Sequence, residues 1–267
     1  MSAATPAAFV TGVGLLGPGM PSWTDGVHTL RGELPWVNAA TVLPAPQSLP
    51  PAERRRVGPS VKLTLASGLE AARHAGIEPA TLPAIFTSSG GDGQNCHEIC
   101  EALATDERQI SPTRFHNSVH NAASGYWGIA TGATAASNAL CAHDGSFGAG
   151  LLEALAQGHA ERTPVLLLAY DSPYPEPIHS FRPIPHAFGV ALVLSSASGP
   201  AALARITANL SHATADTLEG PLEEVRRAIP AARCLPLLQR LARGGAGSVV
   251  LDYLPHARLA VEVTPCR

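Results

Sequence analysis

Two patterns of hydrophobic positions recur along this chain: short continuous apolar runs and a helical period. Together they predict alternating strands and helices. Continuous apolar runs that are too short for helices predict strands buried on both faces. The predicted strands span residues 7–11, 84–88, 164–169, 188–195, 202–208, 247–252 and 259–263. The fourth and fifth of these strands are expected to be neighbours in the sheet.

The helical period, with apolar residues every three or four positions, predicts the remaining elements. Ser22 provides an N-cap for the first helix, and Gly76 provides a stop for the longest one. The predicted helices span residues 22–31, 52–76, 94–104, 146–157, 221–227 and 234–243. Strands that alternate with helices in this way predict a three-layer α/β architecture.

Proline-rich stretches at residues 34–51 and 170–185 predict long loops. The second loop contains His179 and Arg182, and His186 follows it directly. These residues and the length of the loop make it a candidate lid or partner-contact loop.

The composition narrows the class of protein. A chain of 267 residues with 45% hydrophobic content is long enough for one large core, so a single domain over residues 1–267 is expected. Charged residues make up only 15% and the net charge is -3, which argues against nucleic acid and anionic membrane partners. Lys62 is the single lysine, so lysine-based catalysis is nearly excluded.

The cysteines and the N-terminus indicate where the protein resides. Five scattered cysteines do not form a disulfide framework, which favours a reducing cytoplasm. The first residues lack a basic region followed by an apolar one, and no run approaches the roughly 20 apolar residues of a membrane span. A soluble, unprocessed cytoplasmic protein is therefore expected.

Most of the chemistry-capable residues lie in the segment 111–154. His116 and His120 stand four residues apart, and a strand then leads through Cys141, Ala142 and His143 into a helix. Side chains at a strand-to-helix turn lie near free N–H groups and the positive end of the helix dipole, where nucleophiles and anion sites are common. The candidate catalytic residues are Cys141, His120 and His143. The candidate residues of the surrounding pocket and turn are Ala142, Asp144, Gly145, His116 and Asn121.

Two other motifs offer alternative sites. Residues 12–17 form a GxGxxG pattern after a strand, which suggests a dinucleotide site or, more simply, a glycine-rich turn. Cys96, His97 and Cys100, with the pair His116 and His120, suggest a zinc site, whereas buried free thiols are the simpler interpretation. The simpler interpretation is preferred in both cases, so neither a cofactor nor a metal is expected.

Four stretches together resemble the β-ketoacyl synthase (thiolase-like) superfamily. They are FVTGVGLLGPG with the helix ERRRVGPSVKLTLASGLEAARHAGI, the strand and loop AIFTSSGGDG, the central SPTRFHNSVHNAASGYWGIATG with NALCAHDGSFGAGLLEAL, and FGVALVLSS. Within the superfamily, the central block is similar to shortened chain-length-factor proteins of aryl polyene and polyketide pigment pathways. The resemblance covers residues 1–210, the first thiolase-like half. It implies a thiolase-like three-layer α/β/α fold whose second half, residues 211–267, is strongly abbreviated.

The resemblance also bears on catalysis. The family uses one cysteine in the first half and two histidines in the second, but His212 and His256 do not lie in such motifs. When Gly145 and Gly150 are matched to the glycines after the family's cysteine, the nucleophile position falls on Ala142, one residue after Cys141. A one-residue shift in an extended segment points the side chain to the opposite face.

The family therefore implies a non-catalytic or impaired ketosynthase-like subunit that pairs with an active ketosynthase in fatty acid or polyketide-type biosynthesis. Its expected partners are that ketosynthase and an acyl carrier protein, with a homodimer when no ketosynthase is present. In the family, the strand before the nucleophile, here residues 134–140, lies at the dimer interface. Two alternatives stay open: a Cys141-dependent acyltransferase or condensing enzyme acting on acyl carrier protein or coenzyme A thioesters, and a nucleotide-binding module.

Overall fold

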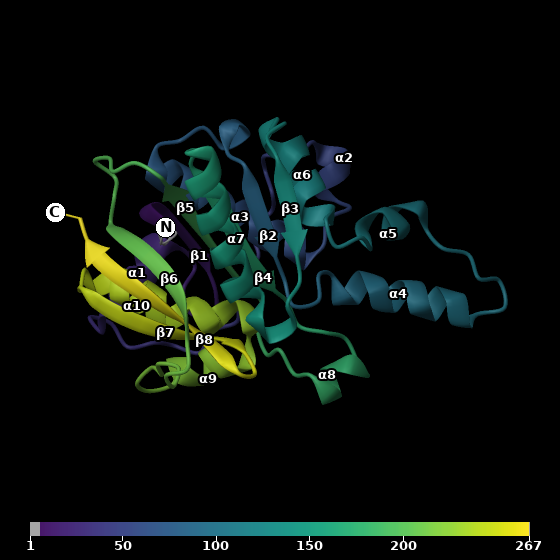
Figure 1. The fold of residues 1–267 in the computed structure, drawn as a ribbon. Helices are drawn as coiled ribbons and strands as arrows, with labels where there is room; N and C mark the ends of the chain where they lie inside the picture. Colours follow the sequence, from purple (N-terminus) through teal and green to yellow (C-terminus); the bar gives the residue numbers. More distant parts are fainter. Residues whose placement is uncertain (1–5, 267) are drawn as a thin grey trace.

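The computed structural model describes residues 6–266, in which eight strands form one mixed sheet (Figure 1). Its order is β3-β2-β4-β5-β1-β6-β8-β7. The strand β2 pairs in parallel with β3 and β4, and every other pairing is antiparallel. The strands are β1 (Ala7–Leu16), β2 (Ala84–Thr87), β3 (Ser137–Leu140), β4 (Val165–Asp171), β5 (Phe188–Ser195), β6 (Ala204–Ser211), β7 (Gly247–Leu254) and β8 (Ala257–Pro265).

Helices cover both faces of this sheet, and the predicted three-layer α/β/α architecture is confirmed. One face packs against α3 and α6, and the other against α7 and α10. The helices are α1 (Trp23–Arg31), α2 (Pro51–Arg54), α3 (Pro59–Ala75), α4 (Gly93–Ala104), α5 (Pro112–Asn117), α6 (Ala122–Thr131), α7 (Ser146–Glu161), α8 (Ile178–Phe181), α9 (Leu222–Ala228) and α10 (Leu235–Arg243). Three 3-10 turns, η1 (Pro79–Thr81), η2 (His143–Gly145) and η3 (Pro230–Cys234), complete them.

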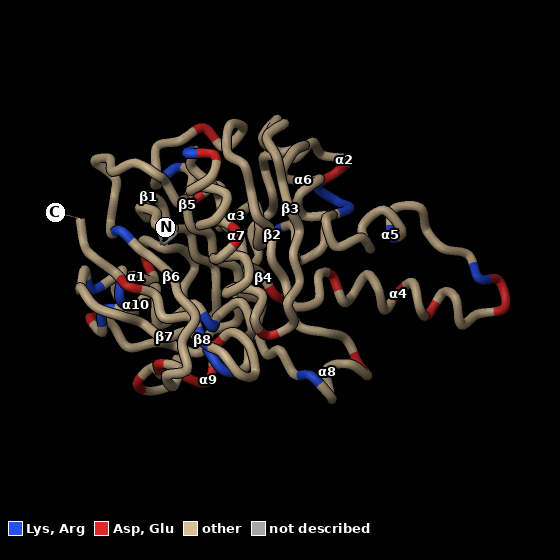
Figure 2. The backbone as a smooth tube through the Cα atoms, viewed as in Figure 1, with Lys and Arg blue, Asp and Glu red and all other residues tan. Residues whose placement is uncertain are grey.

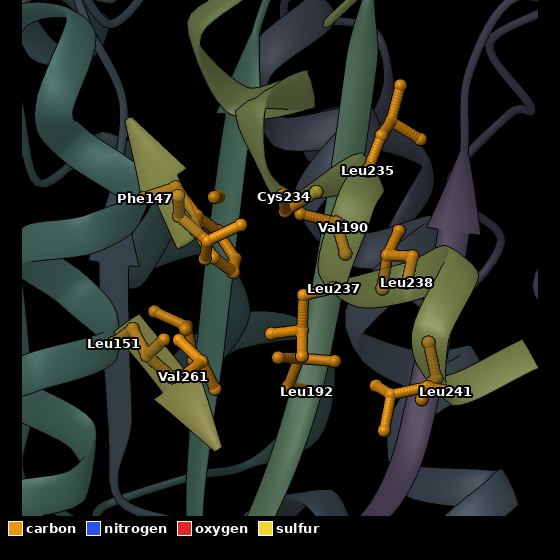
Figure 3. Packing of buried hydrophobic residues seen from close by; sticks show 14 of the residues in the cluster. Phe147, Leu151, Val190, Leu192, Cys234, Leu235, Leu237, Leu238, Leu241 and Val261 are labelled. Carbon is orange, nitrogen blue, oxygen red and sulfur yellow. The ribbon is translucent and has the colours of Figure 1, made fainter. Parts of the chain in front are cut away.

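Strand β4 shows why its sequence is a continuous apolar run. Successive side chains of a strand point to opposite faces, so a strand between two helix layers needs apolar residues at every position. Val165, Leu167 and Ala169 enter the core beneath α7 and α10. Leu166, Leu168 and Tyr170 enter the core beneath α3 and α6. Figure 3 shows the first of these cores, where side chains of α7, β5, β8, η3 and α10 interlock.

Two predicted elements differ from the structure. The expected helix at 52–76 is interrupted, because α2 ends at Arg54 and Pro59 begins α3. Proline has no N–H to donate within a helix, and it favours the first helical position. The strands predicted at 188–195 and 202–208 are not neighbours, because β1 pairs with both β5 and β6 and lies between them. The termini at Ser22 and Gly76 are as predicted: Ser22 accepts the N–H of Asp25, and Gly76 is left-handed.

The GxGxxG pattern lies largely within β1 and does not form the turn that was expected there. The preferred interpretation, a glycine-rich turn, is therefore wrong. The strand is also antiparallel to both neighbours, which does not fit the strand–turn–helix unit of the dinucleotide alternative. The glycines instead allow α3 to approach β1 closely. A Cβ on Gly12 would lie 2.1 Å from the carbonyl oxygen of Ala71, and one on Gly14 would lie 1.9 Å from that of Ser67.

The part of the chain from β6 onward completes one end of the same sheet. Strands β6, β8 and β7 extend it beyond β1, while η3 and α10 cover the face that α7 also covers. None of the helices within residues 6–266 is long and apolar enough to cross a bilayer. Residues 1–5, part of the N-terminus for which no leader is predicted, and Arg267 lie outside the described residues.

We expect Gly14→Ala to lower the free energy of unfolding by about 3 kcal/mol, because the new methyl group would overlap the backbone of α3. Gly125→Ala is the matched control. It lies in α6, where an added Cβ meets nothing within 4 Å, so it should stabilise the protein by about 0.5 kcal/mol. Urea unfolding measures both changes. Equal stability of the two variants would contradict the packing role of Gly14.

Candidate functional site

The candidate site is the turn between β3 and α7, and Ser146 holds it in shape. The Ser146 hydroxyl accepts the N–H of Ala142 at 3.1 Å and lies 2.7 Å from the carbonyl oxygen of His143. It also reaches the carbonyl oxygen of Ser88 at 3.2 Å. Ser146 is buried, so these contacts are shielded from water and tie the turn to the end of β2.

Cys141 is exposed at the start of this turn. Its Sγ lies 3.4 Å from the carbonyl oxygen of Ser89, which belongs to the glycine loop (residues 88–92) after β2. Within residues 6–266, no histidine forms a hydrogen bond with this sulfur. The thiol is thus not hydrogen-bonded to a histidine, the arrangement that commonly activates a catalytic cysteine.

His143 is bound to an arginine and not to Cys141. Its Nε2 accepts a hydrogen bond from Arg182 Nη1 at 2.9 Å, so the proton of the neutral ring is on Nδ1. Its backbone has φ = 50°, a left-handed conformation that costs a non-glycine residue about 1 kcal/mol. The contact with Arg182 holds the ring beside the proline-rich loop that contains α8.

Asp144 joins three segments through two arginines. Oδ1 accepts a hydrogen bond from Arg182 at 2.5 Å, and Oδ2 accepts one from Arg233 of η3 at 2.9 Å. Partial burial works against ionisation, but the hydrogen bond from Arg182 and the charge of Arg233 prevail and hold the pKa of Asp144 below its usual value. The carboxylate is thus an ionic clamp between the turn, the loop of α8 and the C-terminal region.

The two histidines that stand four apart do not share a helix. Helix α5 ends at Asn117, so His116 and His120 diverge. His116 is exposed and packs edge-on against Tyr126, with ring centroids 6.1 Å apart. His120 Nε2 donates to the carbonyl oxygen of Leu140 at 2.9 Å, which fixes the end of β3. Asn121 is exposed, and its carbonyl oxygen accepts the N–H of Gly125 at the start of α6.

The candidate zinc ligands are not brought together. Cys96 and Cys100 lie exposed on α4, and His97 pairs with Glu101 at 3.2 Å. The exposure of both cysteines means that the expectation of buried thiols at these two positions is wrong. Partial loss of hydration around the Cys96 thiol still raises its pKa, which opposes the thiolate form that zinc requires. The part of the chain that the structure describes holds no group of three His, Cys, Asp or Glu residues that could bind a metal ion.

A cavity of about 420 Å³ opens beside the turn. Ala142 and Gly145 line it on one side, and Arg233, Tyr253 and Arg258 line it on the other. Cys141 is not among the lining residues, and its sulfur contacts the glycine loop instead. Position 142 is thus at the cavity, whereas position 141 is directed elsewhere.

Several residues that organise the site were not predicted from the sequence. Asp171 is only 2% exposed, and it accepts hydrogen bonds from the N–H and hydroxyl of Ser89 and from the N–H of Ala231. Burial raises the pKa of this carboxyl group, although these donors partly offset it. Ser146 and Arg233 were also missed. A polar residue directly after the apolar run 165–170 was the only local signal for Asp171.

Comparison with known proteins places this geometry in a family. The model of the β-ketoacyl synthase, N-terminal domain, matches residues 31–245, which is most of the chain. The chain belongs to the β-ketoacyl synthase family. No match is found among curated protein sequences.

Solved structures of ketosynthases and chain length factors share the fold of this β-ketoacyl synthase-like chain. One chain of the ketosynthase ApeO in complex with its chain length factor ApeC, from Xenorhabdus doucetiae, is 24% identical with a TM-score of 0.74; 97% of this chain and 100% of that chain are covered. A chain of the ishigamide ketosynthase/chain length factor is 12% identical with a TM-score of 0.72, and 99% of this chain and 100% of that chain are covered. A β-ketoacyl synthase from Burkholderia phymatum is 11% identical with a TM-score of 0.59, and 90% of this chain and 71% of that chain are covered. The thiolase-like fold with a shortened second half is confirmed.

Asp144 should make part of the stability depend on pH. Its folded-state pKa is depressed, so its contribution is present above the usual value of 3.8 and is lost as the pH falls through the folded pKa. Asp144→Asn should remove this contribution and lower stability at pH 7 by about 1 kcal/mol, since the pair is partly exposed. Thermal melts from pH 7 to pH 3 measure it, with the exposed Asp106→Asn as control. An unchanged pH profile in Asp144→Asn would refute the clamp.

Proposed function

We propose that this chain is a ketosynthase-like subunit of the chain-length-factor type. It pairs with an active ketosynthase in the cytoplasm and shapes the space for a growing acyl chain on an acyl carrier protein, in fatty acid or polyketide-type synthesis such as that of aryl polyene pigments. The observation that carries the proposal is the open sheet edge at β3. As a single domain with a reduced second half, the chain has sheet and cavity walls to offer a partner.

The two edges of the sheet differ. At β7, Asp216 covers the edge, because its N–H donates to the carbonyl oxygen of Val250 and its carboxylate accepts the N–H of Val250. At β3, the edge is short, uncharged and exposed at Ser137 and Asn138 (Figure 2). Proteins protect free edges with charges, prolines or covering loops, so an uncharged, uncovered edge favours pairing with another strand.

Exposed apolar side chains lie on the side of the molecule that carries this edge. Helices α4 and α5 project from the body beyond β3 (Figure 1), and Leu103 and Phe115 on them are 47% and 65% exposed. Val119 and Ile129, in the loop before α6 and on α6, are each 49% exposed. Burial of such surface stabilises an interface by roughly 25 cal/mol per Å². The strand edge and these side chains together support a partner-binding face.

The turn supports a non-catalytic role. Cys141 has no histidine partner within residues 6–266, His143 is held by Arg182, and alanine occupies the position at the cavity. A second candidate function rests on the exposure of Cys141, which would allow an acyltransferase or condensing reaction through its thiol. The two functions differ in whether the protein gains a covalent acyl group.

Two measurements test the proposal. A tagged copy of this chain should retain an untagged, co-expressed, full-length ketosynthase through size-exclusion chromatography. Incubation of the pair with an acyl thioester, followed by intact-mass analysis, should place the acyl group on the ketosynthase and leave this chain unmodified. Loss of the ketosynthase, or acylation of Cys141, would overturn the proposed function.

Backbone direction along β3 gives a sharper test of the interface. The N–H groups of Ala84 and Ser88 donate to the carbonyl oxygens of Ala136 and Leu140, so the even-numbered residues of β3 face β2. The backbone of Ala139 therefore faces the open edge. We expect Ala139→Pro to weaken association at least about tenfold without loss of stability, since proline is tolerated on the free side of an edge strand.

Asn138→Pro is the matched control, because its N–H faces β2. It should lower the free energy of unfolding by about 1–3 kcal/mol through the lost ladder bond. Sedimentation and urea unfolding separate the two effects. If Ala139→Pro assembles like the wild type, β3 is not the pairing strand.

Cys141→Ala should leave product formation by the assembled pair within a few-fold of normal, because its thiol lacks a base. Removal of a true nucleophile typically lowers the rate by about a thousandfold or more. Product yield in cells that carry each variant measures this, with Cys266→Ala as control. A drop on the larger scale would favour the acyltransferase alternative.

A further inference from the structure

A second cavity, of about 490 Å³, lies between α1, α3, β1 and α10. It shares no lining residue with the cavity at Ala142. In Figure 1, α1 and α10 lie side by side, on the opposite side of the molecule from α4 and α5. No part of the proposed partner face or turn contributes to it.

The cavity results from a break in strand pairing. β6 pairs with β1 only from Ala7 to Val10, so the rest of β1 has no strand on that side. Side chains of α3 bind the backbone groups that have no partner strand. The N–H of Val13 donates to His74 Nδ1 at 3.1 Å, and the N–H of Leu15 donates to Glu70 Oε2 at 2.9 Å. Helices α1 and α10 pass over this gap without filling it.

The walls divide into an apolar and a cationic part. Trp23, Val27, Leu203 and Leu241 form the apolar part. Of the two lining arginines, Arg31 lies 3.6 Å from the carboxylate of Glu33, whereas the guanidinium of Arg73 forms no salt bridge within residues 6–266. Pockets of this size with apolar walls and a few placed polar groups are typical of small-molecule sites.

Most polar groups at the walls already have partners. Glu70 Oε1 accepts the N–H of Trp23 at 2.8 Å, and its other oxygen is bound to Leu15, so Glu70 is a structural cap of α1. Arg31 Nε donates to the carbonyl oxygen of Ala242 at 2.7 Å. His28 pairs with Glu33 at 2.6 Å. These contacts hold the walls and leave few groups for a ligand.

Arg73 and His74 are the exceptions. The guanidinium of Arg73 forms no hydrogen bond or salt bridge within residues 6–266, although its charge lies near Glu70. His74 Nδ1 lies 3.1 Å from the N of Val13 and 3.3 Å from its carbonyl oxygen. When Nδ1 accepts at the shorter contact, the neutral ring carries its proton on Nε2, which has no hydrogen-bond partner within residues 6–266. An arginine fork beside an imidazole N–H suits a carboxylate.

We propose that this cavity binds a small amphipathic carboxylate, with its carboxylate at Arg73 and His74 and its short apolar chain against Trp23, Val27 and Leu241. The unpaired guanidinium of Arg73 suits a monoanion. The apolar wall excludes a purely ionic ligand such as acetate from tight binding, because most of the contact area would be left unused.

Calorimetric titration of the full chain with octanoate tests this proposal. Saturable binding with one site per chain is expected, together with at least about tenfold weaker binding of octanol, which lacks the charge, and of acetate, which lacks the chain. Arg73→Gln should weaken octanoate binding about tenfold, whereas Arg205→Gln on β6 should not. Both arginines are exposed, so thermal melts should show that both variants fold.

Two further arms make the result decisive. Val27→Trp should fill the cavity and abolish binding, and tryptophan fluorescence should respond to octanoate in wild type but not in Trp23→Phe, although Trp36 and Trp127 remain. Absence of saturable binding, or octanoate binding unaffected by Arg73→Gln, would overturn the proposal. Tenfold tighter binding of octyl phosphate would overturn the carboxylate assignment. Because this cavity and the β3 face share no residue, either proposal can fail alone.

Discussion

The buried carboxyl group of Asp171 connects the parts on which the site depends. It lies at the end of β4, accepts the backbone and hydroxyl protons of Ser89, and accepts the N–H of Ala231 from η3. A buried carboxyl group without hydrogen-bond donors is strongly destabilising. The folded state therefore favours positions of the glycine loop and the C-terminal segment in which Ser89 and Ala231 donate to Asp171. One side chain thereby ties the central sheet to two segments that are far apart in the chain.

The turn at Ala142 is built on this foundation. The thiol of Cys141 contacts the carbonyl oxygen of Ser89, and the hydroxyl of Ser146 contacts the carbonyl oxygen of Ser88. His120 donates to the carbonyl oxygen of Leu140 and so holds the end of β3. The carboxylate of Asp144 accepts hydrogen bonds from Arg182 at one oxygen and from Arg233 at the other. The turn thus places alanine at the cavity and directs the thiol of Cys141 toward the glycine loop.

The sheet also explains how the molecule divides into regions of different use. Its β7 edge is covered by Asp216, and the break beside β1 is sealed by Glu70 and His74, so backbone groups there are satisfied within the chain. Among residues 6–266, none covers the β3 edge in this way, and exposed apolar side chains lie on the same side of the molecule (Figure 1). Unpaired backbone groups that a strand could satisfy are the physical reason for placing the partner face there.

The sequence alone determined what depends on local periodicity and caps. The continuous apolar run of β4, the run 188–195 of β5 and the ends of helices at Ser22 and Gly76 were all read correctly, because burial on both faces and capping act within a few residues. The central block also indicated the family. The glycines of β1 misled, since a glycine that permits close packing and one that permits a turn look alike in a sequence.

Only the tertiary structure decided which distant groups meet. Arg182 and Arg233 reach Asp144 from 38 and 89 residues away, and Asp171 finds Ala231 across 60 residues. The four-residue spacing of His116 and His120 was a helical signal that the end of α5 at Asn117 overrode. Hydrophobic periodicity reports on neighbours along one element, whereas ion pairs and buried hydrogen bonds depend on how the loops bring separate elements together, so the site's electrostatics emerged only from the folded sheet.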